Sequence, residues 1–204
     1  MGYRVTLIEG DGIGPEVTGA TCEILKAAGA PVEWERVPGG TKAYEEFGNP
    51  MPEAVFKSIR ANRVGLKGPL ATPKGKGYRS ANVTLRQELQ LYTGWRPVHS
   101  LPGVRSRYQD VDLCVLRENT QGLYAGIEHQ VTPGTIVSLK ISTAEAGERI
   151  ARWAFDYACN RGRRKITVCH KKAVLPLADG AFVDAFFEVG QEYPFIEQEQ
   201  RALD

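Results

Sequence analysis

Three arginines in this sequence lie in stretches that could place them at one binding site. Arg86 lies in SANVTLRQEL, a few residues after Ser80 and Asn82. Arg96 lies in WRP, and Arg117 ends the apolar run DLCVLR. Arginine stays charged and makes paired hydrogen bonds to carboxylates. Three converging guanidinium groups would therefore bind a di- or tricarboxylate, whereas scattered ones would be solvated surface charges.

A tyrosine and a lysine could transfer protons at such a site. Tyr124 lies in QGLYAG, and Lys171 follows the apolar run RKITVCH. The two side chains can act as a proton-transfer pair if burial and neighbouring charges lower their pKa values. Taken alone, each residue is also explained as a packed ring or a surface amine.

The stretch GDGIGPE invites comparison with a dinucleotide-binding loop. A fingerprint that starts at Gly10 requires glycine where Pro15 stands, so the match fails. Gly12 and Gly14 can adopt positive φ, and Pro15 suits the first turn of a helix. The residues alone therefore predict a tight turn that opens a helix.

The stretch LKGPLATPKGKGYRS forms a long glycine-rich loop after a strand that ends at Lys67. Long ordered loops at strand ends are frequent binding sites. Ser80 or Asn82 could cap the helix that follows. The free N–H groups at such a helix start also suit an anion, so capping and anion binding both stay open.

Strand-like and helical hydrophobic periods alternate over the first part of the chain. Strands are predicted over residues 3–9, 32–37 and 63–68, and helices over residues 16–28 and 49–62. The first helix stops before a glycine, which is a common end signal. This alternation is typical of an α/β layer whose strands run parallel.

The pattern changes near Pro97, where a loop-rich stretch begins. The later strands are predicted over residues 111–119, 121–130, 135–142, 164–170 and 195–200, and helices over residues 144–160 and 178–192. We therefore predict two domains, 1–97 and 98–204.

The composition argues against two classes of partner. The chain has 204 residues and a formal net charge of +2, which gives no field that would gather nucleic acid. No stretch approaches the roughly 20 apolar residues that span a membrane. The first residues also lack the pattern of a signal peptide. We expect no nucleic-acid partner, no membrane and a cytoplasmic protein.

The four cysteines show no metal-binding pattern. Cys22, Cys114, Cys159 and Cys169 form no CxxC pair and have no zinc spacing with histidine. Each stands among apolar residues, so we expect buried free thiols in a reducing compartment.

Several of these stretches together resemble one enzyme family. GDGIGPE, LKGPLATP, SANVTLRQEL, RENTQGLYAGIEHQVTPG and YPFIEQEQRALD are similar in order and spacing to the isocitrate and isopropylmalate dehydrogenases, which are metal-dependent β-decarboxylating enzymes. The resemblance covers essentially the whole chain. Ser80, Asn82 and the stretch GIEHQVTPG favour the isocitrate branch. The implied fold is α/β, with the N-terminal half of the large domain followed by the small dimerising domain.

The resemblance also implies an activity and a role for each site residue. The reaction would be oxidative decarboxylation of isocitrate to 2-oxoglutarate with NAD or NADP and Mg²⁺ or Mn²⁺. The substrate carboxylates would be held by Ser80, Asn82, Arg86, Arg96 and Arg117. Tyr124 and Lys171 would transfer protons, and Lys67 and Thr72 would lie beside the nicotinamide. Asp204 would correspond to a metal-ligand aspartate that reaches a neighbouring subunit, so we expect a homodimer or pairing with a full-length homologue.

The sequence also departs from the family pattern. The family's chain continues past the matched region with further metal-binding aspartates and an adenosine-binding loop. Gly94 and Ala173 stand where the family commonly has asparagine, and Pro176 stands where it commonly has lysine. The alternative is therefore a catalytically silent truncated paralogue or regulatory subunit, which binds a carboxylate or pairs with a full-length partner.

Overall fold

The chain forms two compact units. The computed structural model describes residues 2–72 and 80–203. The first unit ends at Gln90 and the second begins at Leu91. Each unit has its own strands, helices and buried core.

The strand β4 (Thr93–His99) belongs to the second unit. It pairs antiparallel with β5 (Asp112–Glu118) over its whole length, from Thr93 opposite Glu118 to His99 opposite Asp112. The sequence analysis places the boundary near Pro97, inside this strand. A change in composition marks where loops become frequent, whereas the division between units follows the pairing of the strand.

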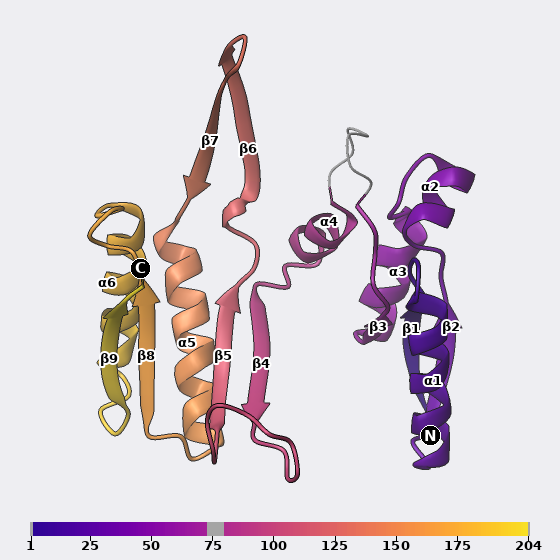
Figure 1. Ribbon diagram of the computed structural model, residues 1–204, viewed down its shortest axis with the longest axis horizontal. Helices are drawn as coiled ribbons and strands as arrows, with labels where there is room; N and C mark the ends of the chain where they lie inside the picture. The colour runs from indigo at the N-terminus through magenta and orange to yellow at the C-terminus, as the bar shows by residue number, and fades with distance from the viewer. Residues whose placement is uncertain (1, 73–79, 204) are drawn as a thin grey trace. The chain divides into compact units, whose positions relative to one another are not determined.

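The elements of the first unit alternate as the sequence predicts. They are β1 (Tyr3–Ile8), α1 (Gly14–Ala27), β2 (Val32–Arg36), α2 (Thr41–Phe47), α3 (Glu53–Asn62), β3 (Gly65–Lys67) and α4 (Ala81–Glu88). The sheet order is β2-β1-β3, and both neighbouring pairs run parallel (Figure 1). The predicted α/β layer with parallel strands is therefore confirmed for this unit.

The short helix α2 is absent from the sequence prediction. It has seven residues, too few to show a clear hydrophobic period. It begins after Gly40, whose φ of 85° suits glycine. The backbone N–H of Thr41 donates to the Asp11 carboxylate at 2.7 Å. The start of α2 is thus fixed by a residue far back in the chain, which a local pattern does not reveal.

The core of the first unit forms around its central strand. Residues Val5–Ile8 of β1 are all buried. Ile8 of this strand belongs to a buried cluster with Met51, Val55, Phe56, Leu70, Ala81 and Leu85. The buried hydroxyl of Thr6 hydrogen-bonds the Ser58 hydroxyl at 2.7 Å and accepts from the Asn62 amide at 2.9 Å. The one polar side chain of this strand segment is therefore satisfied.

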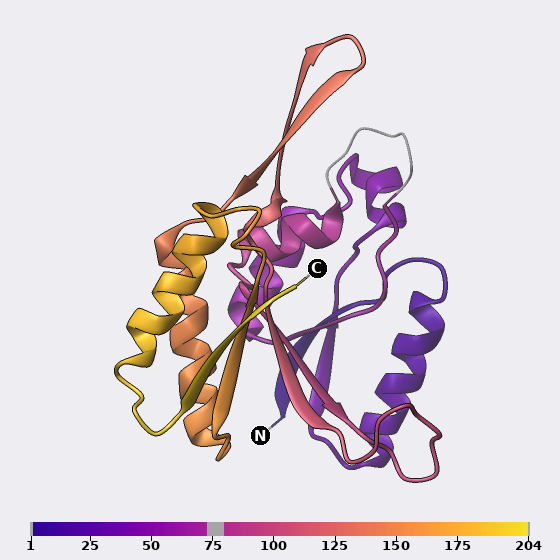
Figure 2. The same ribbon diagram turned by 60° about the vertical axis from the view of Figure 1, so that its left-hand side comes forward.

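The second unit combines three pairs of strands with two helices. After β4 and β5 follow β6 (Gly122–Thr132), β7 (Thr135–Ile141), α5 (Ala144–Asn160), β8 (Lys165–His170), α6 (Ala178–Gly190) and β9 (Glu197–Ala202). β6 and β7 form an antiparallel hairpin, and β8 and β9 pair in parallel. Figures 1 and 2 show this hairpin projecting beyond α5 and α6, which pack side by side against β8 and β9.

Helix α5 begins where the sequence predicts. The Thr143 hydroxyl accepts a hydrogen bond from the Ala146 N–H at 3.2 Å, and Glu145 lies in the first turn. Both features stabilise a helix start. The helix buries Ile150 and Phe155 on one face and exposes charged residues on the other. Across residues 2–72 and 80–203, no helix has the length and apolar character needed to cross a membrane.

The core of the second unit is aromatic. Phe155 of α5 is fully buried, and its ring stacks on Phe186 at 5.2 Å and on Tyr193 at 5.0 Å. Val183 of α6 and Val168 of β8 belong to the same cluster. One side chain therefore joins both helices to the strands beneath them.

All four cysteines are free, as predicted, but the prediction of burial is wrong. Cys22 and Cys114 are half-buried, whereas Cys159 and Cys169 are exposed. Cys169 alternates along β8 with the buried Val168, so it faces the other side of the strand. An apolar sequence neighbourhood does not fix the direction of a side chain within a strand.

Phe155→Ala should destabilise the second unit by about 3–5 kcal/mol, because it removes a fully buried ring and leaves a cavity. The free energy of unfolding from urea titrations would measure the change. Phe195→Ala is the matched control, because that ring is 94% exposed. Equal losses for the two variants would contradict the assigned core.

Candidate active site

The predicted site residues of the first unit lie around one loop. They are Lys67, Thr72, Ser80, Asn82 and Arg86. The Thr72 hydroxyl donates to the Ser80 hydroxyl oxygen at 3.3 Å. The Asn82 amide donates to the Leu70 carbonyl at 3.4 Å. These two bonds hold the segment after β3 against the start of α4.

Lys67 shares an electrostatic environment with Arg86. It ends β3 and is half-buried, and its ammonium donates to the Gly68 carbonyl at 2.6 Å. Burial and the positive charge of Arg86 lower the pKa of Lys67, while the nearby carboxylate of Asp11 acts in the opposite direction. Two cations in one environment create a local positive potential that an anionic ligand would relieve.

The start of α4 lacks the predicted side-chain cap. Ser80 occupies the N-cap position, but its side chain makes no cap hydrogen bond to the helix. Its hydroxyl instead accepts from Thr72. Asn82 lies inside the first turn and bonds the Leu70 carbonyl. Capping by Ser80 or Asn82 is therefore wrong, because both side chains are used to hold the preceding loop, and anion binding here stays a prediction.

In the second unit, the structure joins the predicted carboxylate ligand to the predicted proton donor. The Arg117 guanidinium donates to the Tyr124 hydroxyl at 2.6 Å, and it lies 4.9 Å from the centre of the same ring. The first contact is a charged hydrogen bond and the second is a cation–π contact. Arg117 therefore fixes the direction of the Tyr124 hydroxyl.

Arg96 and Arg117 lie on one face of the β4–β5 pair. Gly94 stands opposite Arg117, and Arg96 stands opposite Val115. Because side chains alternate along a strand, these four residues share a face. Trp95 lies on the other face, where its ring contacts α5. Both guanidinium groups are on the exposed face, where a ligand could reach them.

Lys171 is held through its backbone by a buried carboxylate. It follows β8, and its N–H donates to the Asp179 carboxylate at 2.6 Å. Asp179 also forms an ion pair with Lys140 of β7. Burial raises the pKa of Asp179, but the hydrogen bonds from Lys140 and from the Lys171 backbone outweigh it and hold this pKa below its ordinary value. The Lys171 side chain itself is exposed.

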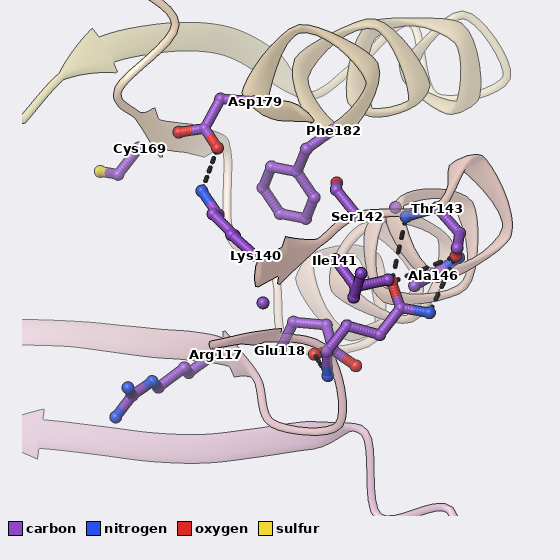
Figure 3. Close-up of a pocket in the computed structure, with 13 residues that line it drawn as sticks. Arg117, Glu118, Lys140, Ile141, Ser142, Thr143, Ala146, Cys169, Asp179 and Phe182 are labelled. Carbon is purple, nitrogen blue, oxygen red and sulfur yellow. Dashed lines mark hydrogen bonds and ion pairs between the residues drawn. The ribbon is translucent and has the colours of Figure 1, made fainter. Parts of the chain in front are cut away.

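A cavity of about 330 Å³ lies beside this ion pair. Its wall includes Arg117, Glu118, Lys140 and Asp179. Figure 3 shows Lys140 and Asp179 directed toward each other, whereas Arg117 extends away from them. Two cations are thus balanced by two carboxylates, so the cavity alone offers no excess positive charge for a tricarboxylate.

Glu118 holds the turn between β5 and β6. Its carboxylate accepts the N–H groups of Thr120 at 2.8 Å and Gln121 at 2.7 Å. It also forms an ion pair with Arg149 of α5 at 3.3 Å. These bonds fix the turn between the two strands that carry the predicted arginine and tyrosine, and therefore help to set their spacing.

The described residues do not form a metal site. Asp204, the predicted metal ligand, lies outside the described residues. Within residues 2–72 and 80–203, no group of three histidine, cysteine, aspartate or glutamate side chains could hold a metal ion. Mg²⁺ is usually bound by one or two carboxylates together with water and substrate, so we assign no metal role to the described residues.

The predicted site residues divide between the two units. Arg86 lies in the first unit, whereas Arg96, Arg117, Tyr124 and Lys171 lie in the second. Within the second unit the structure brings Arg117 to Tyr124 and places Arg96 on the same strand face as Arg117. Convergence of all three arginines in one cleft stays a prediction.

Three acidic residues near these sites were missed by the sequence analysis. Asp11, Glu118 and Asp179 each accept at least one backbone N–H: Asp11 and Asp179 from another segment, and Glu118 from the turn that follows it. Their positions in the sequence could have indicated this role. Asp11 lies between two glycines, Glu118 is the last residue of an apolar strand, and Asp179 lies in the first turn of a helix. A carboxylate at such a position is a candidate for binding free N–H groups.

Comparison with known proteins identifies the family. The model of the isocitrate/isopropylmalate dehydrogenase family matches residues 4–204. This chain belongs to that family. A solved structure of isocitrate dehydrogenase from Methylococcus capsulatus superposes with a TM-score of 0.93 at 46% identity, covering 98% of this chain and 60% of that one. The predicted fold of the isocitrate/isopropylmalate dehydrogenases is therefore confirmed.

Curated relatives come from both branches of the family. The probable mitochondrial NAD isocitrate dehydrogenase subunit alpha of Drosophila melanogaster is 45% identical over 98% of this chain and 53% of its own length. The chloroplastic 3-isopropylmalate dehydrogenase of Solanum tuberosum is 46% identical over 98% of this chain and 56% of its own length. The chain spans about half the length of these relatives. Their organellar names lend no support to the cytoplasmic location expected from the sequence, which stays a prediction.

Asp179→Asn should destabilise the second unit by about 2 kcal/mol at pH 7, because it weakens a buried charged network. The folded-state pKa of Asp179 lies below its ordinary value of 3.8. The stability that the ionised group supplies is thus present above that pH and lost as pH falls through the folded-state pKa.

Urea unfolding between pH 3 and 7 would measure this difference from the unsubstituted protein. Asp184→Asn is the control, because it removes an exposed ion pair with Lys172 and should cost less than about 1 kcal/mol. An Asp179→Asn difference that stays constant down to pH 3 would contradict the assigned role.

Proposed function

We propose that the protein containing this chain catalyses the oxidative decarboxylation of isocitrate to 2-oxoglutarate with NAD or NADP. The observation that carries the proposal is the 2.6 Å hydrogen bond from the Arg117 guanidinium to the Tyr124 hydroxyl. It joins the predicted carboxylate ligand and the predicted proton donor in one hydrogen-bonded pair. Membership of the dehydrogenase family supports the general reaction class.

The substrate would be held through its carboxylates. Arg96 and Arg117 present guanidinium groups on one exposed strand face, and Arg86 belongs to the positive environment of Lys67. Isocitrate carries three carboxylates, and guanidinium groups bind carboxylates through paired hydrogen bonds. Ser80 and Asn82 would add a hydroxyl and an amide from the start of α4.

The residues of the first unit fit the nicotinamide end of the cofactor. Lys67 supplies an ammonium and Thr72 a hydroxyl, and both are donors suited to a carboxamide oxygen. When bound, the nicotinamide supplies a hydride acceptor for the alcohol carbon of the substrate. In this proposal Lys67 and Thr72 orient that ring, and the bond between Thr72 and Ser80 ties its position to the substrate-binding helix.

Proton transfer would depend on Tyr124 and Lys171. After hydride transfer and loss of carbon dioxide, the substrate is left as an enolate that must gain a proton. Tyr124, oriented by Arg117, would donate that proton. Lys171 would accept the proton that the substrate hydroxyl loses during hydride transfer and would return a proton to Tyr124, and Asp179 would fix the backbone from which the lysine extends.

A divalent cation is part of the family's chemistry, but no step is assigned to it here. The part of the chain that the structure describes has no cluster that fits a metal ion. Asp204 is the single residue that we link to Mg²⁺ or Mn²⁺, and the link is by sequence resemblance. The steps above use only groups of this chain.

A regulatory or catalytically silent subunit is the second candidate. The amide nitrogen of Asn119 lies 2.4 Å from where a Cβ at Gly94 would stand, so it occupies the space of the family's usual side chain opposite Arg117. Ala173 likewise offers no amide two residues after Lys171. Isocitrate binding without cofactor reduction would favour this candidate.

We also propose a homodimer or pairing with a full-length homologue through the β6–β7 hairpin. A two-stranded hairpin is marginally stable alone. It exposes Leu123, Val131 and Ile136, with 70%, 56% and 66% of their surface accessible. A second chain that covers these side chains would stabilise both partners.

Arg117→Ala should raise the isocitrate KM roughly ten-fold to a hundred-fold, because it removes a charged hydrogen-bond donor to a carboxylate. Steady-state reduction of NAD and NADP, with isocitrate and with isopropylmalate, would measure it. Arg152→Ala is the control, because that arginine pairs with Glu148 and Glu192 on the exposed side of α5. An unchanged isocitrate KM, or a preference for isopropylmalate, would contradict the proposed substrate site.

Tyr124→Phe should lower kcat by roughly a hundred-fold or more with little change in the isocitrate KM, because it removes a proton donor and keeps the ring. The same assay would measure both constants. Tyr108→Phe, at an exposed tyrosine, should leave both constants unchanged. A kcat that matches the unsubstituted enzyme would rule out Tyr124 as the acid.

A further inference from the structure

The GDGIGPE stretch does more than open a helix. Its backbone lies directly against the segment Gly68–Thr72, which we call the cofactor loop. A Cβ added at Gly10 would stand 2.1 Å from the Pro69 carbonyl oxygen, and one at Gly68 would stand 2.0 Å from the Glu9 carbonyl oxygen. Real Cβ atoms do not approach so closely. The glycines therefore serve a backbone-to-backbone contact between two segments far apart in sequence.

Asp11 forms the polar centre of this contact. One carboxylate oxygen accepts the Ala71 N–H at 2.7 Å, and the other accepts the Thr41 N–H at 2.7 Å. The Asp11 backbone N–H donates to the Pro69 carbonyl at 2.7 Å. Asp11 thus hydrogen-bonds the cofactor loop on both sides of Leu70 and links this loop to the start of α2.

Three features favour a positioning role over a simple turn. Hydrogen bonds to a charged acceptor are about twice as strong as neutral ones. Thr72 directly follows Ala71, and Lys67 lies two residues before Pro69; both are proposed to contact the nicotinamide. Asp11 also lies close enough to Lys67 to influence its ammonium. No other function assigned above uses this carboxylate.

We propose that Asp11 is a positioning residue for nicotinamide binding, acting through the cofactor loop without touching the cofactor. The inference rests on the proposed roles of Lys67 and Thr72. It predicts that loss of the carboxylate frees Ala71, displaces the Thr72 hydroxyl and weakens cofactor binding more than substrate binding.

The test uses the Asp11→Asn and Asp11→Ala variants of the full natural protein that contains this chain. Asparagine keeps one acceptor oxygen and alanine keeps none, so the effects should be graded. We expect the NAD(P) KM to rise about three-fold for Asp11→Asn and at least ten-fold for Asp11→Ala, with a change in isocitrate KM at least three times smaller. Direct titration with NADH and NADPH, followed by their fluorescence, measures binding apart from turnover.

Hydrogen exchange gives a second readout that is independent of activity. The amides of Ala71 and Thr41 should both exchange faster in Asp11→Ala, because both lose their acceptor, whereas Asp11→Asn should speed the exchange of at least one of them. Glu9→Gln is the matched control. Glu9 lies on the same loop, but its side chain pairs with Arg36 of β2 and does not reach the cofactor loop. It should change neither readout, and thermal unfolding should show that all variants remain folded.

Each of the following outcomes supports or overturns the positioning role of Asp11. Faster exchange with weaker cofactor binding supports the inference. Unchanged NAD(P) affinity in Asp11→Ala overturns the inference, whether or not hydrogen exchange changes. In that case the proposed function is still supported if the unsubstituted protein turns over isocitrate. Cofactor binding without isocitrate turnover, weakened by Asp11→Ala, supports the inference and overturns the proposed function. An unsubstituted protein that binds neither NADH nor NADPH overturns both.

Discussion

Carboxylates that accept backbone N–H groups hold the segments beside the predicted site residues. Asp11 binds the loop that carries Thr72, Glu118 binds the turn between the strands of Arg117 and Tyr124, and Asp179 binds the backbone of Lys171. Backbone N–H groups in loops have no partner in a helix or sheet and must be satisfied in another way. An ionised carboxylate satisfies two of them at once and makes the bonds strong. The loops that carry reactive groups can therefore be irregular and still well defined.

The cationic groups are arranged differently from these carboxylates. Arg117 is anchored by a tyrosine hydroxyl and ring, whereas Arg152 and Arg163 on the same unit are paired with acidic side chains. Lys67 is half-buried beside another cation. A guanidinium already paired with a carboxylate has little left for a ligand, but one held by a neutral tyrosine keeps its charge available. This difference separates Arg117 from Arg152 and Arg163.

Much of the fold could be predicted from the sequence, because it follows from local pattern. The parallel strands of the first unit and the start of α5 at Thr143 were predicted from hydrophobic period and capping chemistry. The helix α2 could not be predicted, because Asp11 fixes its start across a long stretch of chain. The exposure of Cys169 was also missed, because the direction of a strand side chain depends on which face is covered.

Within the candidate site, the pairing of Arg117 with Tyr124 was only partly predicted. Sequence motifs named both residues, but the contact between them depends on how β5 turns into β6.

The central claim is that arginines from both units meet the carboxylates of one small substrate. A crystal structure of the protein with isocitrate bound tests it most directly. The account predicts that the guanidinium groups of Arg86, Arg96 and Arg117 each lie within about 3.2 Å of a carboxylate oxygen of the same isocitrate molecule. Isocitrate bound elsewhere, with these three side chains directed into solvent, would contradict it.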